Sequence, residues 1–191
     1  MAQFLRLPKI LIAALLSTSA YADALDTVIA PQVGAIYIDE SRISSENSTT
    51  SVEGYRYTFR VDFMSLSSNI SVNLVAGIGG RYNDYGAQFR IFDLFQMGQA
   101  GSSGLYYGIG AGYSYSPGYI IKEIEKTAFY DVVATAFLRF QWDTESAWGI
   151  FTELAYENVI QRSLAVKPAV YDKVSTNRYV LNMGVPFEVD L

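Results

Sequence analysis

The chain has 191 residues and a formal net charge of −5 at pH 7. This acidic balance argues against nucleic acid as a partner, because phosphate binding needs clustered Lys and Arg. Cys is absent, which excludes disulfides, thiolate metal sites and a lipidated Cys. The charged fraction of 17 % is low for a soluble domain, in which about a quarter is typical.

The first 22 residues have the three parts of a secretory signal peptide. Arg6 and Lys9 precede an apolar run over residues 10–16, and small and polar residues follow up to Ala22. The apolar run is too short to span a bilayer as a helix, so we predict export and cleavage after Ala22. Residues 23–191 then form one domain of moderate size.

The first strong structural signal after this segment is a strict alternation over residues 54–63. Tyr55, Tyr57, Phe59, Val61 and Phe63 alternate there with Arg56, Thr58, Arg60 and Asp62. Side chains of a strand point alternately to opposite faces, so this strand needs an apolar environment on one side and a polar one on the other. Either a bilayer lies outside it or an apolar core lies inside it.

Similar alternation recurs along the chain and predicts eight strands. They lie near residues 33–39, 54–63, 69–79, 85–91, 105–115, 130–142, 148–157 and 177–191, and the register of residues 92–104 stays open. We expect a mobile polar loop at 41–53 and the longest loop at 158–173. Eight tilted strands of about 9 to 11 residues fit the mature length, and an even number closes an antiparallel sheet. The predicted fold is all-β, an eight-stranded antiparallel transmembrane β-barrel with up-and-down meander topology.

A network of charged residues is predicted on the inward face. It comprises Arg56, Arg60, Asp62, Arg90, Asp131, Arg139, Glu153 and Glu157. The interior of an eight-stranded barrel is only wide enough for its side chains to fill it, and buried opposite charges pair by default. We therefore favour a plug of paired charges over a narrow gated pore and over a catalytic constellation. Inward glycines at 108, 110 and 112 should leave room for the arginines.

The chain contains no His, so activation of a nucleophile by His is impossible. We expect no enzymatic activity, no cofactor and no metal site.

Aromatic residues near the strand ends predict an interfacial girdle, formed by Trp142, Trp148, Tyr113, Tyr115 and Tyr156. The two Trp residues flank one short turn, and the tyrosines gather near the other rim, together with Tyr55, Tyr82, Tyr85, Tyr130 and Tyr179. A soluble periplasmic lipid-binding barrel, with its apolar face turned inward, stays open as an alternative. Against it, the opposite face is crowded with Arg, Asp and Glu, and a soluble barrel rarely exposes so little charge.

The C-terminus, residues 182–189, reads Asn-Met-Gly-Val-Pro-Phe-Glu-Val and resembles the terminal assembly signal of bacterial outer-membrane barrels. With the signal peptide and the eight alternating segments, the mature chain resembles the small OmpA/OmpX-type barrels. Two departures are Leu191, where Phe is usual, and Pro186, which removes a hydrogen-bond donor from the strand.

This resemblance implies a monomer in the cell outer membrane that contacts the lipid bilayer and lipopolysaccharide. It also implies delivery to the barrel-assembly machinery through the C-terminal strand. The expected function is envelope integrity, or surface binding and adhesion through extracellular loops. The alternatives are a narrow gated pore for ions or small solutes and the soluble lipid-binding barrel.

Overall fold

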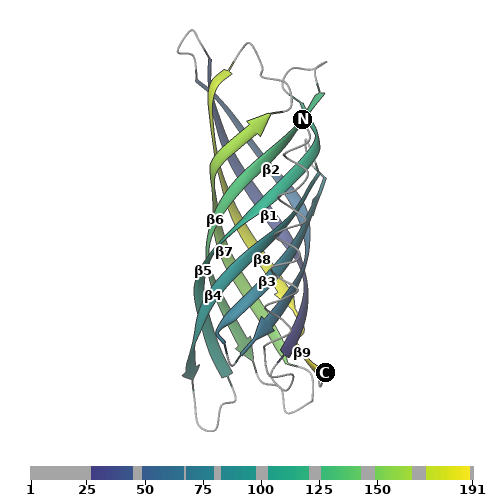
Figure 1. Ribbon diagram of the computed structural model, residues 1–191, viewed down its shortest axis with the longest axis vertical. Helices are drawn as coiled ribbons and strands as arrows, with labels where there is room; N and C mark the ends of the chain where they lie inside the picture. Colours follow the sequence, from purple (N-terminus) through teal and green to yellow (C-terminus); the bar gives the residue numbers. More distant parts are fainter. Residues whose placement is uncertain are drawn as a thin grey trace.

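The computed structural model describes residues 27–44, 49–66, 68–79, 83–97, 103–120, 126–142, 149–164 and 171–189 (Figure 1). The predicted signal peptide, Trp148 and Leu191 lie outside these ranges. The described residues contain β1 (Thr27–Ser44), β2 (Thr49–Ser65), β3 (Ile70–Ile78), β4 (Asp84–Met97), β5 (Ser103–Ile120), β6 (Lys126–Trp142), β7 (Ile150–Leu164), β8 (Tyr171–Gly184) and β9 (Phe187–Val189). No helix in the described ranges is long and apolar enough to cross a membrane.

The strands form a closed antiparallel meander. Each strand from β1 to β8 pairs with the next, and β1 also pairs with β8, which closes the barrel. Figure 1 shows the strands tilted and wound around one axis. The predicted eight-stranded antiparallel barrel is therefore confirmed.

The pairing register sets the width of the barrel. We start at Tyr55 on β2 and move from each residue to its paired neighbour on the next strand. After one turn around the barrel this path returns to β2 at Ser65, ten residues further along the strand. An eight-stranded sheet with such a stagger closes with tilted strands and an interior that side chains fill. Alternate residues of each strand must therefore pack against one another inside.

Two predicted loops are largely strand. β1 continues to Ser44 and β2 begins at Thr49, within the predicted loop 41–53, and Ile43 pairs with Thr49. β7 likewise continues to Leu164 and β8 begins at Tyr171, within the predicted loop 158–173. The sequences of these added strand segments do not alternate between apolar and polar residues. Outside a bilayer, two paired strands need only the hydrogen bonds between their backbone groups. In the stretch of open register, β4 continues to Met97 and Phe92 is buried in the lumen.

The last predicted strand, residues 177–191, begins earlier than expected, at Tyr171, and is interrupted near its end; residues 190 and 191 lie outside the described residues. β8 ends at Gly184, and only the three residues of β9 follow, after a gap at Val185 and Pro186. Pro186 has no N–H with which to continue pairing toward β7, so the ladder between β7 and β8 stops there.

Candidate functional site: the charged lumen and the tyrosine girdle

The lumen is lined by polar and charged side chains that are almost wholly buried. All eight charged residues predicted to face inward have exposed fractions of 3 % or less. Four further charged residues point into the same space, namely Glu40, Asp84, Arg162 and Arg178. Their arrangement divides into three clusters along the barrel axis.

The first cluster contains Asp62, Arg90, Arg139 and Glu153. Arg90 donates from Nη1 to both carboxylate oxygens of Glu153, at 3.1 and 3.2 Å. Arg139 donates to Glu153 Oε2 from Nε at 3.0 Å and from Nη2 at 2.6 Å, and also to Asp62. Two arginines thus share two carboxylates, which balances the charge of the cluster.

The second cluster is centred on Glu157. Arg60 donates to Glu157 Oε1 at 2.7 Å, and Gln88 donates to the same oxygen at 2.8 Å. Gln88 also accepts from Arg90 Nη2 at 3.2 Å, so it connects this cluster to the first one. Arg178 lies 3.8 Å from Glu157 Oε2 and connects it to the third.

The third cluster is centred on Asp131. Arg178 and Arg162 each donate to Asp131 Oδ2 at 2.8 Å, and Arg162 Nε donates to Oδ1 at 2.7 Å. Arg162 also donates to Glu40 at 2.8 Å. Asp84 lies 3.2 Å from Arg178 and accepts from Arg56 at 2.8 Å.

Together the three clusters form one connected network with no net charge. It contains six arginines and six carboxylates, and each of these arginines has a carboxylate oxygen within 3.1 Å. Aromatic rings cover three of the guanidinium groups: Phe137 covers Arg90, Phe151 covers Arg139 and Phe129 covers Arg162, at 4.6, 4.3 and 4.1 Å. The lumen is therefore occupied by paired charges and rings, which stabilise each other by cation–π contact as well.

Three of the four overlooked charges carried a signal in the sequence. Glu40, Asp84 and Arg178 continue the inward alternation of their strands, but they lay in stretches that were read as loops or were not assigned a face. Arg162 carried no such signal. A β-bulge at Ile160 places two consecutive residues opposite Val132, so that Ile160 and Gln161 both face outward and Arg162 turns inward.

The glycines on the inward faces do make room for lumen side chains. A Cβ at Gly110 would lie 2.8 Å from Arg90 Cγ, and one at Gly108 would lie 2.8 Å from the Phe137 ring. A Cβ at Gly77 would be within 3.5 Å of an Arg56 guanidinium nitrogen. A Cβ at Gly108 or Gly110 would also meet a backbone carbonyl of β4, whereas one at Gly77 would meet the Asp84 carboxylate.

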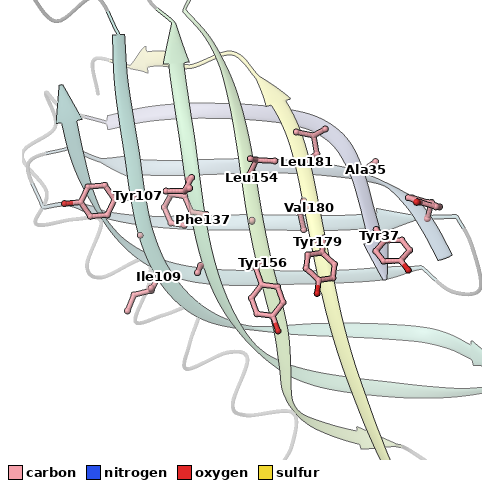
Figure 2. A pocket seen from close by; sticks show the side chains of 15 residues that line it. Ala35, Tyr37, Tyr107, Ile109, Phe137, Leu154, Tyr156, Tyr179, Val180 and Leu181 are labelled. Carbon is pink, nitrogen blue, oxygen red and sulfur yellow. The ribbon is translucent and has the colours of Figure 1, made fainter. Parts of the chain in front are cut away.

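The outer surface carries tyrosines near one end of the barrel. Tyr55, Tyr37, Tyr179 and Tyr156 are paired across β2, β1, β8 and β7, with ring centroids 5.1, 6.1 and 5.4 Å apart in that order. Figure 2 shows the last three side by side. Tyr130, Tyr115 and Tyr85 are similarly paired across β6, β5 and β4. We call these seven residues the tyrosine girdle.

A polar row begins one step beyond the girdle. Glu53, Asp39, Asn177 and Asn158 are paired across β2, β1, β8 and β7, two residues further along each strand. Tyr156 donates to Asn177 Oδ1 at 2.8 Å. An apolar groove of about 760 Å³ borders the girdle, lined by four of its tyrosines and by smaller residues such as Ala35 and Ala136. Tyrosine between polar and apolar zones is typical of a membrane interface.

Four of the five residues predicted for the girdle have outward, exposed side chains. Tyr113, Tyr115 and Tyr156 lie in or close to the tyrosine girdle, whereas Trp142 is at the opposite end of the barrel, where its ring contacts Phe140 edge-on at 4.6 Å. The fifth, Trp148, lies outside the described residues. Tyr55, Tyr85, Tyr130 and Tyr179 were expected near the same rim, and Tyr37 is the member of the tyrosine girdle that the sequence analysis missed.

Comparison with known proteins identifies the fold. No protein-family model and no curated protein matches the sequence. The structure of Neisserial surface protein A resembles the chain with a TM-score of 0.54 at 10 % identity, over 84 % of this chain and 97 % of that one. Identity this low establishes a common fold and nothing finer.

Two further structures match with lower scores. The N-terminal β-barrel domain of Pseudomonas aeruginosa OprF has a TM-score of 0.44 at 13 % identity, over 82 % of this chain and 97 % of that one. Ail, the attachment invasion locus protein of Yersinia pestis, solved with the heparin analogue sucrose octasulfate, has 0.42 at 10 %, over 85 % and 99 %. The chain has the fold of the small outer-membrane barrels of the OmpA/OmpX type, as its sequence pattern predicted.

Proposed function

We propose that this chain is a monomeric integral protein of the outer membrane, with a lumen closed by paired charges and a projecting sheet that binds partners at the cell surface. The observation that carries the closed lumen is the neutral network of six arginines and six carboxylates, which runs without interruption from Asp62 to Glu40. We also propose that the protein has no enzymatic activity. Among the described residues, no group of three or more His, Cys, Asp or Glu could hold a metal ion.

The outer surface supports the membrane location. Large apolar side chains are exposed over the whole wall on one side of the tyrosine girdle, for example Leu154, Leu181 and Ile109. An apolar surface this extensive is stable in lipid and would cause association in water. A soluble lipid-binding barrel would need an apolar interior, whereas this lumen holds twelve paired charges.

Electrophoretic mobility tests the membrane barrel directly. The mature protein, extracted from membranes, is compared in SDS before and after boiling, because a closed transmembrane barrel stays folded in detergent until it is heated. We expect a mobility shift on boiling and recovery in the outer-membrane fraction. Equal mobility, with the protein recovered from the soluble periplasm, would refute the proposal.

Single-channel recording tests the closed lumen. We expect the wild-type protein to produce no steady conductance in planar bilayers. A narrow gated pore is the alternative, since the same ion pairs could exchange partners and open a path. A steady conductance of the wild-type protein that is lost or raised when Arg60 or Glu153 is neutralised would establish that pore. The same result would reject a lumen closed by paired charges.

The projecting sheet supports surface binding. β3 pairs with β2 only from Tyr57 to Ser65, and β4 pairs with β5 only up to Tyr115. Residues 49–54 of β2 and 116–120 of β5 therefore continue beyond the girdle, and no described strand pairs with them on the side of β3 and β4. Strand edges of this kind offer backbone N–H and C=O groups to a partner outside the bilayer. The connecting loops, to which the sequence assigned binding, lie mostly outside the described residues.

Surface binding is tested with whole cells that display the protein. A variant in which residues 42–50 are replaced by Asn-Gly shortens the hairpin of β1 and β2, and a matched variant shortens the hairpin of β7 and β8. We expect adhesion to host cells or matrix glycans to fall with the first variant while heat-modifiability is kept. A different outcome is that cells that display the protein and cells that lack it adhere equally, while a strain in which the gene is deleted becomes sensitive to detergent. This pair of results would favour a role in envelope integrity instead.

Three further parts of the proposal concern partners. The polar row beyond the girdle is placed to contact lipid headgroups, including lipopolysaccharide on the outer leaflet. The C-terminal strand is proposed to engage the barrel-assembly machinery. A monomer is expected because the whole apolar wall is then covered by lipid, and light scattering of the detergent-solubilised protein checks the mass.

A further inference from the structure

The lining of the lumen changes from charged to apolar near the end of the barrel where the C-terminus lies (Figure 1). On three strands of the first cluster the next inward residue toward this end is apolar, namely Met64 on β2, Phe92 on β4 and Phe151 on β7. Val28 of β1 is paired with Met64, and the Tyr106 ring of β5 meets the Phe92 ring edge-on at 5.9 Å. We call these five residues the apolar layer.

The apolar layer extends across the lumen. Its five side chains are buried and come from five of the eight barrel strands. On β8, a Cβ at Gly184 would meet the Phe151 ring, so this ring covers the inner wall there. On β6, the Arg139 guanidinium lies 4.3 Å from the centre of the Phe151 ring and donates from Nη1 to Met64 Sδ at 2.7 Å. Leu66 packs against the buried cluster to which Met64 belongs. The first cluster is thus separated from this end of the barrel by apolar side chains.

Polar groups without a protein partner line one side of the lumen next to the layer. Among the described residues, no hydrogen-bond partner reaches seven buried side-chain atoms there, which belong to Gln32, Arg60, Asp62, Ser71, Asn73 and Asn182. These six residues are neighbours on β8, β1, β2 and β3. Gln32 is paired with Arg60 and Asp62 with Asn73, and Asn182 donates to Gln32 at 3.2 Å. We call them the polar wall.

The polar wall has the chemistry of a site for ordered water. Its free atoms include Nη1 of Arg60, which only donates, and Oδ1 of Asp62, which only accepts, while Asn73 has both a donor and an acceptor free. An ion of either sign would suit one of these groups and oppose the other, whereas water donates and accepts. A buried water makes about three hydrogen bonds, so seven atoms correspond to on the order of three waters.

We propose that the apolar layer is the barrier that keeps the water of the polar wall, and small ions, from reaching the periplasm. Charged and amide side chains exchange partners with water, so paired charges exclude large solutes but admit water among them. An apolar constriction offers no such hydrogen bonds and excludes water and ions by dewetting. This inference rests on the proposed closed lumen and names the part of it that seals.

Nuclear magnetic resonance of the mature protein in lipid nanodiscs tests where water lies. Magnetisation transferred from water at short mixing times should reach the side-chain amide groups of Asn73 and Gln32. It should not reach the Phe92 ring or the Met64 methyl group. No transfer to the two amides, or transfer to Phe92 and Met64 as strong as to Asn73, would overturn the proposal without the need for any variant.

Conductance in planar bilayers tests the barrier. Met64→Ser with Phe92→Ser opens the apolar layer and should give steady conductance, whereas the wild type gives none. Met64→Ala is the milder variant, to be used if the double variant is not heat-modifiable in SDS. The control is Phe89→Ser, on the lipid-facing side of the strand that carries Phe92, and it should stay silent. Conductance of the control as large as that of the layer variant would mean that any change in the wall opens the barrel, and would reject the layer.

An ion-pair variant separates the two ways of closing the lumen. Arg60→Gln with Glu157→Gln removes one ion pair of the second cluster and leaves the apolar layer intact, so it should conduct no more than the wild type. Conductance in this variant would make the paired charges the barrier and overturn the proposal.

The recordings also distinguish this inference from the proposed function. Steady conductance of the wild type would reject the closed lumen and the inference with it. A silent wild type together with a silent, heat-modifiable layer variant would reject the apolar layer as the barrier and leave the proposed closed lumen standing.

Discussion

Replacing Glu153 by Gln removes the carboxylate at the centre of the first lumen cluster. Glu153 is fully buried and accepts four hydrogen bonds, two from Arg90 and two from Arg139. Gln keeps one acceptor oxygen but turns an amide N–H₂ toward the guanidinium groups. Asp62 then faces both arginines, and the cluster carries one uncompensated positive charge in the barrel interior.

Removal of one partner of a buried ion pair costs about 3–5 kcal/mol. Because Gln retains one acceptor, we expect Glu153→Gln to lower the free energy of unfolding by about 3 kcal/mol, more than a hundredfold in the folding equilibrium. The assay is reversible urea unfolding in lipid bilayers, followed by tryptophan fluorescence. Glu53→Gln, at an exposed carboxylate beyond the tyrosine girdle, is the control and should change stability by less than about 0.5 kcal/mol.

A double-mutant cycle refines the test. With Glu153 neutralised, Asp62 is the remaining carboxylate beside Arg139, so Asp62→Asn should cost more in that background than in the wild type, by about 0.5–3 kcal/mol. If Glu153→Gln lowers the free energy of unfolding no more than Glu53→Gln does, the lumen ion pairs do not stabilise the barrel. That result would refute the reasoning above.

Three other substitutions probe the wall. Leu154→Arg places a charge on the lipid-facing surface and should destabilise by about 2–4 kcal/mol in bilayer unfolding assays, an effect that would be missing if no lipid surrounded the barrel. Gly112→Ala should destabilise the barrel by about 1–3 kcal/mol, because the new Cβ would meet the Ala87 carbonyl. The control Gly54→Ala should not, because the space around Gly54 is open. Equal losses of stability for the two variants would contradict the packing argument. Deletion of Ile160 should be tolerated, because it removes only the extra residue of the bulge and leaves Arg162 facing inward. Deletion of Ala155 shifts the register by one residue and turns inward side chains outward, so it should abolish heat-modifiability.

The sequence was most informative where one strand face meets lipid. Period-two alternation gave the inward and outward faces of β5 and β6 correctly, including Asp131 and Arg139 in the lumen. It was least informative beyond the girdle, where β1 and β2 continue with Ser and Thr. No apolar environment demands alternation there, so a paired strand and a polar loop have the same composition.

Proline illustrates a second limit. From sequence, Pro186 could be recognised as a missing donor, but its effect depends on which neighbour that donor would have faced. The register shows that it faces Gly149, just before the start of β7, so the ladder between β7 and β8 ends at Gly184 while β9 keeps its ladder to β1. Pro31, which carried no signal in the sequence analysis, faces the seam and removes a bond from it.

The sequence by itself determined the barrel, its apolar exterior and the inward position of most charged residues, because the alternation of side chains is a local property of each strand. The tertiary structure decided which charges pair. Arg139 contacts Asp62 across 77 positions of sequence, and Arg162 reaches Glu40 across 122. These partners are set by the ten-residue stagger and by the bulge at Ile160, which accumulate around the closed sheet and are fixed only when β1 meets β8.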